Sequence, residues 1–161
     1  MKILTSKLFS AREDFIKRHR KPNVLTLEKD TKVINMSGTS NRLPDGDFEN
    51  SWTWYWMAFS KESLRCSQCG KLLWNKEDET SVEACKKWIR QHEINNHVEG
   101  KDDKESLNEY ESQGGHVKLE GIRYITPLCS QHNTDNIGEE IVLEAGSVLV
   151  EEVEPRIVDV N

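Results

Sequence analysis

The chain has 161 residues, of which 35% are hydrophobic and 31% charged, and its formal net charge at pH 7 is −6. This length and composition predict a single domain (residues 1–161) with a modest core, and no apolar run is long enough to span a bilayer. The acidic balance disfavours a general nucleic-acid binder, and the first ten residues are too polar for a signal peptide, so we expect a cytoplasmic protein without membrane contact.

Charge is distributed unevenly along the chain. Residues 1–22 carry seven lysines and arginines against two acids, whereas residues 134–161 carry eight acids against one arginine. We expect a basic helical arm over residues 1–22 and an acidic tail over residues 151–161. Two interpretations of these charged ends are open. The arm binds phosphate while the tail mimics or repels it, or both are ordinary solvated surfaces.

The first predicted element is an amphipathic helix over residues 7–20, which Pro22 ends. Short strands are predicted over residues 24–27 and 32–36. A loop follows over residues 37–48, where a glycine, a proline and an Asp-Gly pair mark turns.

A dense aromatic segment occupies residues 52–59. Trp52, Trp54 and Trp56 alternate along it, and this period of two predicts a strand with one face lined by indoles. Two interpretations are open for that face. It is either a stacking platform for bases or a partner, or the main core of a chain that has few apolar residues.

The second half of the chain begins with a predicted amphipathic helix over residues 81–97 and a polar loop over residues 99–113. Further on, short apolar runs flank turn signals and predict two hairpins: residues 116–119 with 122–125, and residues 141–143 with 148–150.

The four cysteines favour a metal site over disulfides, because we expect a reducing compartment. Cys66 and Cys69 form a Cys-x-x-Cys turn followed by glycine, in which both sulfurs can point at one ion. A redox pair has the same spacing, but no thioredoxin-like βαβ pattern surrounds this one.

A closed structural zinc site needs two further ligands. One possible set is Cys129 and His132, a Cys-x-x-His pair that follows the first predicted hairpin. The other is His92 and His97 on the predicted helix, which resembles a two-Cys, two-His finger with a long loop.

Mixed sets that include His116 or Cys85 also stay open. Cys85 lies on the apolar face of the predicted helix, where a small buried hydrophobe is the more usual role. Iron could replace zinc in a sulfur-containing site, but the histidine and the lack of redox context favour zinc.

Three segments of the chain resemble the zinc-stabilised branch of the His-Asn-His (HNH) endonuclease-like, treble-clef group. They are the Cys66–Cys69 pair, residues 114–117 and residues 124–133. The segments also resemble short bacterial and phage-type proteins. The resemblance covers roughly residues 66–137, interrupted by the predicted helix and polar loop. It implies an α+β fold with a small treble-clef zinc core, short antiparallel strands and an inserted helix. The implied zinc ligands are Cys66, Cys69, Cys129 and His132.

The resemblance also implies catalytic roles. His116 would stand in the place of the general base that activates water for attack on a phosphodiester. Asn133 would stand where the group has a second catalytic histidine, and a second divalent ion would stabilise the leaving oxygen.

This sequence departs from the group, because the asparagine that orients the base and the double-histidine segment have no clear counterpart. We therefore expect a non-catalytic binding or regulatory module for a protein or nucleic-acid partner. One alternative is an HNH-like metal-dependent nuclease that uses His116 as general base. Another is a finger-type nucleic-acid reader that uses the helix over residues 81–97.

Overall fold

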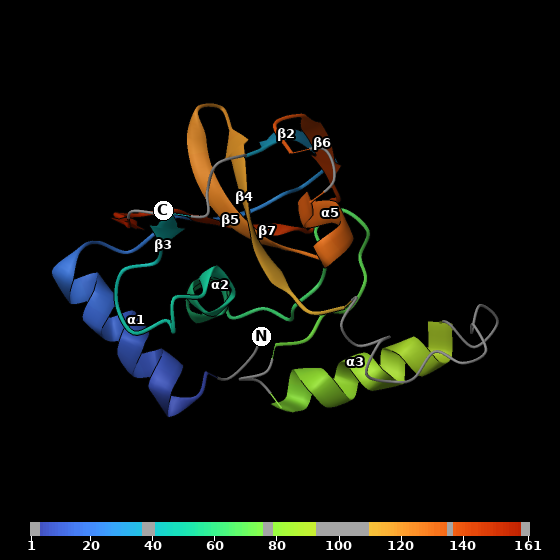
Figure 1. The fold of residues 1–161 in the computed structure, drawn as a ribbon, viewed down its shortest axis with the longest axis horizontal. Coiled ribbons are helices and arrows are strands. Elements are labelled where there is room, and N and C mark those ends of the chain that lie inside the picture. Colours follow the sequence, from blue (N-terminus) through green and yellow to red (C-terminus); the bar gives the residue numbers. More distant parts are fainter. Residues whose placement is uncertain (1–3, 37–40, 76–78, 93–109, 135–136, 159–161) are drawn as a thin grey trace.

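The structure is a computed structural model, and it describes residues 4–36, 41–75, 79–92, 110–134 and 137–158. The described residues form a mixed α+β fold of four helices, a six-stranded sheet and a two-stranded sheet (Figure 1). Every strand pairing in these sheets is antiparallel. None of the described helices is long and apolar enough to cross a membrane.

The large sheet has the strand order β1-β7-β5-β4-β2-β6. Within it, β4 and β5 form the tight hairpin that the sequence predicts. The two turn residues, Glu120 and Gly121, have φ of 51° and 82°, as in a type I′ turn that matches the twist of paired strands. The strands are β1 (Val24–Thr26), β2 (Thr31–Asn35), β4 (Gln113–Leu119), β5 (Ile122–Leu128), β6 (Glu140–Leu143) and β7 (Val148–Glu151).

The second predicted hairpin is wrong, because β6 pairs with β2 while β7 lies between β1 and β5. The connections β1–β2 and β6–β7 each join distant positions of the strand order, and they hydrogen-bond to one another. Leu27 N donates to Ser147 O (2.9 Å), and Gly146 N donates to Leu27 O (2.7 Å). The sheet therefore curls until its edges approach. A glycine-containing turn between two apolar runs suits such a crossing as well as a hairpin.

Helix α2 (Trp52–Ser60) occupies the aromatic segment, so the strand predicted there is wrong. The Ser51 side chain caps the helix by accepting a hydrogen bond from Trp54 N (3.3 Å), and Lys61 ends it in the left-handed conformation. Every residue from 52 to 59 is buried, since α1 covers one side of α2 and the sheet another (Figure 1). A helix buried all round has no polar face, so its 3.6-residue period cannot be read from the sequence.

The aromatic segment is therefore core, as one of its two interpretations predicts, and it cannot serve as a stacking platform. A buried N–H group needs a hydrogen-bond acceptor, and each indole N–H of this segment has one. Trp52 donates to Arg42 O (2.9 Å), Trp54 to Asn75 Oδ1 (3.1 Å) and Trp56 to Val148 O (2.8 Å).

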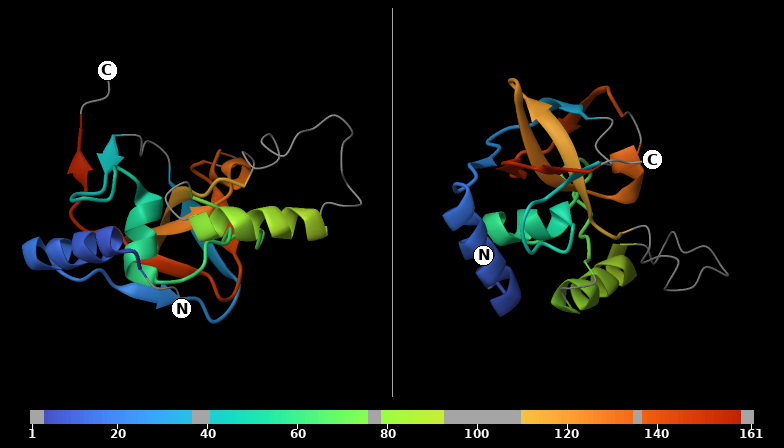
Figure 2. Two further views of the ribbon diagram at one scale, coloured as in Figure 1. Left: turned by 90° about the horizontal axis from the view of Figure 1, so that it is seen from below. Right: turned by 60° about the vertical axis from the view of Figure 1, so that its left-hand side comes forward.

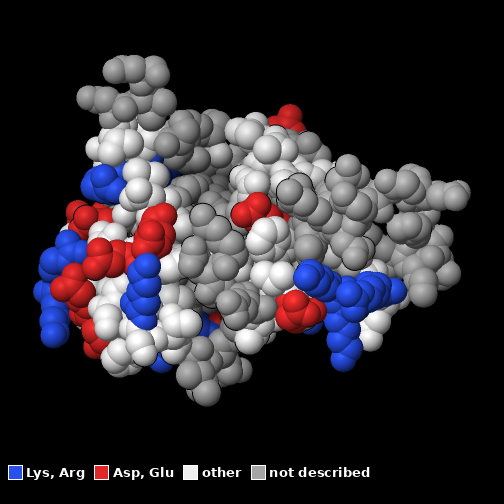
Figure 3. All heavy atoms as spheres, turned by 60° about the horizontal axis from the view of Figure 1, so that its bottom comes forward, with Lys and Arg blue, Asp and Glu red and all other residues white. Residues whose placement is uncertain are grey.

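Helix α1 (Ser6–Arg18) confirms the first predicted helix to within two residues and packs on α2 through its buried Leu8, Ala11 and Phe15. In this basic segment Lys7, Arg12 and Arg18 lie beside acids, and Figure 3 shows both signs intermingled at this end of the molecule. Arg20, just beyond the helix, donates to both carboxylate oxygens of Glu151 at 2.7 and 2.8 Å. The basic and acidic ends of the sequence thus partly neutralise each other.

The remaining elements are α3 (Glu79–His92), α5 (Ser130–Thr134) and the small sheet of β3 (Arg42–Leu43) and β8 (Arg156–Ile157). Helix α3 starts two residues before its predicted beginning and projects from the body (Figures 1 and 2). Residues 93–97 of the predicted helix and 99–109 of the predicted polar loop lie outside the described residues. The predicted end of that loop, at residue 113, is wrong, because Tyr110 is buried and β4 begins at Gln113.

We predict that Tyr55→Phe destabilises the fold, because the fully buried Tyr55 hydroxyl donates to Glu151 O (2.6 Å) and accepts from Val153 N (3.2 Å). The loss should be about 1–3 kcal/mol in the free energy of unfolding, measured by urea denaturation. Tyr124→Phe is the matched control, because its hydroxyl makes no hydrogen bond to a described residue. Equal unfolding midpoints for the two variants would contradict this role for Tyr55.

Candidate metal centre

The first half of the centre is a tight turn between two short extended segments. Cys66 N donates to Lys71 O (2.9 Å), Gly70 N donates to Cys66 O (2.8 Å), and Arg65 and Leu72 form a β-bridge. Gly70 has a φ of 75°, which is the left-handed region that glycine adopts without strain. This knuckle holds the sulfurs of Cys66 and Cys69 on the same side of the turn.

The second half lies where β5 passes into α5. Asn133 N donates to Cys129 O (2.9 Å), so the first helical turn begins at Cys129 and carries His132 on the same side. Hydrogen bonds join the two halves of the centre directly. Ser67 N donates to Pro127 O (2.9 Å), and the buried hydroxyls of Ser67 and Thr126 lie 2.5 Å apart.

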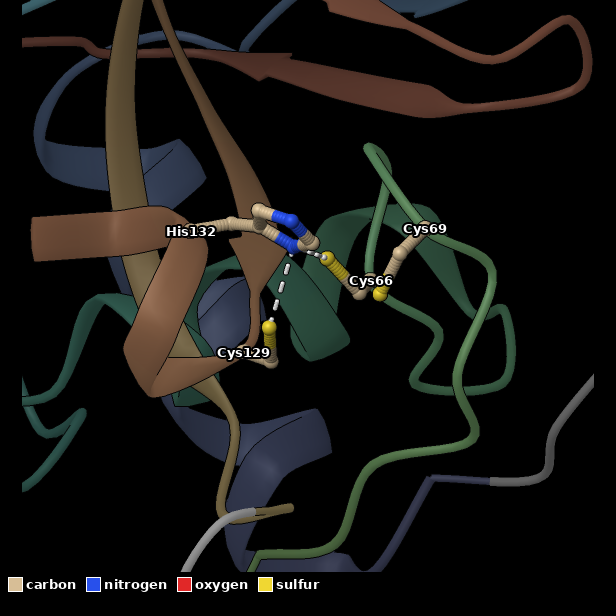
Figure 4. A group of neighbouring side chains, drawn as sticks. All are labelled: Cys66, Cys69, Cys129 and His132. Carbon is tan, nitrogen blue, oxygen red and sulfur yellow. Dashed lines mark hydrogen bonds between the residues drawn. The ribbon is translucent and has the colours of Figure 1, made fainter. Parts of the chain in front are cut away.

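These contacts bring the four predicted ligands together (Figure 4). Their ligand atoms all lie within 4.8 Å of one another. His132 Nδ1 is 3.1 Å from Cys129 Sγ and 3.6 Å from Cys66 Sγ. A tetrahedral ion with metal–sulfur bonds of about 2.3 Å has ligand–ligand distances of about 3.5–3.8 Å. The four residues therefore lie close enough to bind one metal ion, which is consistent with a structural metal.

The three sulfurs influence one another strongly. The thiols of Cys66 and Cys69 donate to Cys129 Sγ, and this lowers the pKa of Cys129 well below its usual range. The same hydrogen bonds to Cys129 raise the pKa of Cys66 and of Cys69. Three sulfurs and an imidazole nitrogen at this proximity form a donor set that suits a cation.

The other candidate ligands are not part of this group. Cys85 is fully buried on α3, where its thiol donates to Leu72 O (3.4 Å), so the interpretation of Cys85 as a buried hydrophobe is confirmed. The side chains of His92 and His97 lie outside the described residues. His116 belongs to β4 and does not join the four ligands.

The candidate general base, His116, lies in the interior. Its side chain is 6% exposed and packs edge-on against Trp52, with ring centroids 5.2 Å apart. Its Nε2 is buried, has no hydrogen-bond partner among the described residues, and lies 3.9 Å from Glu152 Oε2. Burial lowers the pKa of His116 to about 4, although the nearby Glu152 opposes the shift. His116 is therefore neutral at pH 7 and shielded from solvent.

Asn133 does not share a face with His116. Its amide donates to Gln113 Oε1 (2.8 Å), and Gln113 and His116 lie three positions apart on β4. Since side chains alternate along a strand, residues three apart point to opposite faces of the sheet. The structure thus does not bring the two candidate catalytic residues together on one face.

Two groups near these sites have no signal in the sequence. Glu152 has a fully buried carboxylate that Arg42 and Arg123 hold, although it belongs to the predicted acidic tail. Ser67 and Thr126 join the two metal half-sites. All of these contacts depend on residues far apart in the chain, so no local pattern could show them.

We predict that His116 makes stability depend on pH. Its pKa is about 4 in the folded protein and about 6.5 in an unfolded chain, so the unfolded state binds the extra proton between these values. The free energy of unfolding should therefore fall as the pH falls through this window, by up to about 1.4 kcal/mol per pH unit. Urea denaturation at a series of pH values measures this slope.

His116→Phe is the comparison for that slope, because it keeps a ring beside Trp52 and removes the titrating group. The difference between wild type and variant isolates His116 from the metal ligands, which also titrate. Parallel slopes for the two proteins would contradict the assignment.

No protein-family model, no curated protein and no solved structure matches this chain.

Proposed function

We propose that this chain is a small zinc-binding protein that acts as a non-catalytic binding module. The observation that supports this most is the ligand set, because four protein atoms are enough to complete a tetrahedral site. Structural zinc is held by four side chains, whereas catalytic zinc keeps one position for water or substrate. Three sulfurs and an imidazole, with no carboxylate among them, favour zinc over magnesium or calcium.

The order of elements around the ligands supports a treble-clef core. The knuckle comes first, the β4–β5 hairpin next and α5 last, which is the order implied by the resemblance to the HNH-like group. Bound zinc would supply folding free energy by fixing ligands from both halves of the chain. The chain's own contribution is to pre-position those ligands through the hydrogen bonds of Ser67 to Pro127 and Thr126.

The surface that supports a nucleic-acid partner is the outer side of α3. Lys86, Lys87 and Arg90 belong to this helix, with one acid, Glu83, 3.6 Å from Lys86. Figure 3 shows a group of cations with an acid beside it at one end of the molecule. Lys87 and Arg90 are exposed and make no ion pair with a described residue. We name these three cations the α3 basic face. Such a face contacts phosphates without reading sequence, even on a protein that is acidic overall.

The nuclease alternative gains less support from the geometry. A general base has to reach the water that it activates, but His116 is buried against Trp52 and the Asn133 amide is occupied by Gln113. The finger-type alternative needs histidines of the α3 segment as zinc ligands, whereas Cys129 and His132 already complete a set of four.

We predict that the full chain binds short DNA or RNA duplexes or single strands at low salt, measured by fluorescence anisotropy. Lys87→Glu with Arg90→Glu should weaken binding by about tenfold or more and reduce the salt dependence of the affinity by about two units of slope. Lys29→Glu with Lys32→Glu, an equal charge change near β2, should leave the affinity nearly unchanged.

Three outcomes would contradict parts of this proposal. No binding at low salt would exclude a nucleic-acid partner, and an equal loss in both double variants would exclude the α3 basic face. Strand cleavage with Mg²⁺ or Mn²⁺ that His116→Ala abolishes would show a nuclease instead of a binding module.

A further inference from the structure

A cavity of about 560 Å³, open to solvent, lies where α2 ends and the chain passes from α1 to β1. Three cations line it, Arg12 from α1, Lys21 from the connection and Lys61 from the end of α2. Its other walls are Asn23 and the apolar side chains of Pro22, Val24 and Phe59. No acid is among the described residues that line it.

Arg12 is held in a position that leaves its Nε donor without an acceptor among the described residues. Its guanidinium carbon lies 5.7 Å from the centre of the Phe59 ring, and its Nη1 donates to Glu13 Oε1 (2.7 Å). Its Nε is buried and has no hydrogen-bond partner among the described residues. A buried N–H without an acceptor is costly, and Arg12 is one of the residues that line the cavity.

Two of the cations that line this cavity, Lys21 and Lys61, differ from most of the described cations of the basic segment. Lys7, Arg18 and Arg20 each contact a carboxylate, as described above. Lys21 and Lys61 make no ion pair with any residue that the structure describes. Of the nearby acids, Glu13 holds Arg12 and Glu151 holds Arg20 and Asn23 N, whereas Glu62, the residue after Lys61, is exposed. Local positive charge therefore remains at the cavity although the protein is acidic.

We propose that this cavity binds a phosphorylated small molecule that carries a planar or apolar group. The three cations match a phosphate dianion, and the walls formed by Phe59, Pro22 and Val24 match the apolar group. The volume lies within the range of about 300–1,000 Å³ that is usual for small-molecule sites, so a nucleoside monophosphate is of suitable size. This site is separate from the metal centre and from the α3 basic face.

The test is a titration of the full, ¹⁵N-labelled chain followed by amide chemical shifts. The probes are adenosine monophosphate, inorganic phosphate and adenosine. We expect the monophosphate to shift the amides of Asn23, Phe59 and Lys61 at millimolar or lower concentration. Inorganic phosphate should shift the same amides more weakly, and adenosine should leave them unchanged.

Lys21→Gln with Lys61→Gln should weaken binding of the monophosphate by about tenfold or more, because it removes two charge-assisted contacts. Lys29→Gln with Lys32→Gln, which removes two exposed lysines elsewhere, should not. The amide spectrum without ligand shows in the same experiment that each variant is folded.

Any of four results would overturn the proposal. These are no shift with either phosphate compound, equal shifts with adenosine, shifts confined to α3, or equal weakening by both double variants. Saturation by an oligonucleotide but by no mononucleotide would also overturn it, because the phosphate would then belong to a nucleic-acid backbone.

Discussion

Ser67, the residue after the first cysteine ligand, connects the metal centre to the sheet. Its N–H donates to Pro127 O, its hydroxyl contacts Thr126, and its carbonyl accepts from Glu144 N and from Ser147 Oγ. The first two contacts join the knuckle to the end of β5, and the last two join it to the connection between β6 and β7. The metal ligands and the curl of the sheet therefore depend on the same residue, and a metal at the four ligands would stabilise both.

The four candidate metal ligands could be predicted from the sequence because each half-site is local. Cys-x-x-Cys with a following glycine, and Cys-x-x-His after a hairpin, are patterns of a few residues, and the structure brings the two pairs together. The β4–β5 hairpin was predictable for the same reason, since its Glu-Gly turn lies between two short apolar runs. The choice between Cys129 with His132 and His92 with His97 as partners of Cys66 and Cys69 could be made only from the tertiary fold.

Helix α2 and the partners of strands β6 and β7 could not be predicted, because the physical cause lies in the tertiary arrangement. Burial on all sides removed the polar face that identifies a helix, and the curl of the sheet separated two runs that look like a hairpin. The charge pattern was misleading in a related way. A basic start and an acidic end suggest an arm and a tail, but Arg20 pairs with Glu151, and Glu152 is buried between Arg42 and Arg123. Among the described residues, cations that make no ion pair include Lys87 and Arg90 on α3 and Lys21 and Lys61 at the cavity.

The most direct test of the central claim is the zinc content per chain, measured by elemental analysis of the purified wild type, Cys69→Ser and Cys85→Ser. Both substitutions remove one thiol, but only Cys69 belongs to the four-residue group. We expect one zinc per chain in the wild type and in Cys85→Ser, with strongly reduced zinc in Cys69→Ser. A wild type without bound metal, or equal zinc in Cys69→Ser and Cys85→Ser, would contradict it.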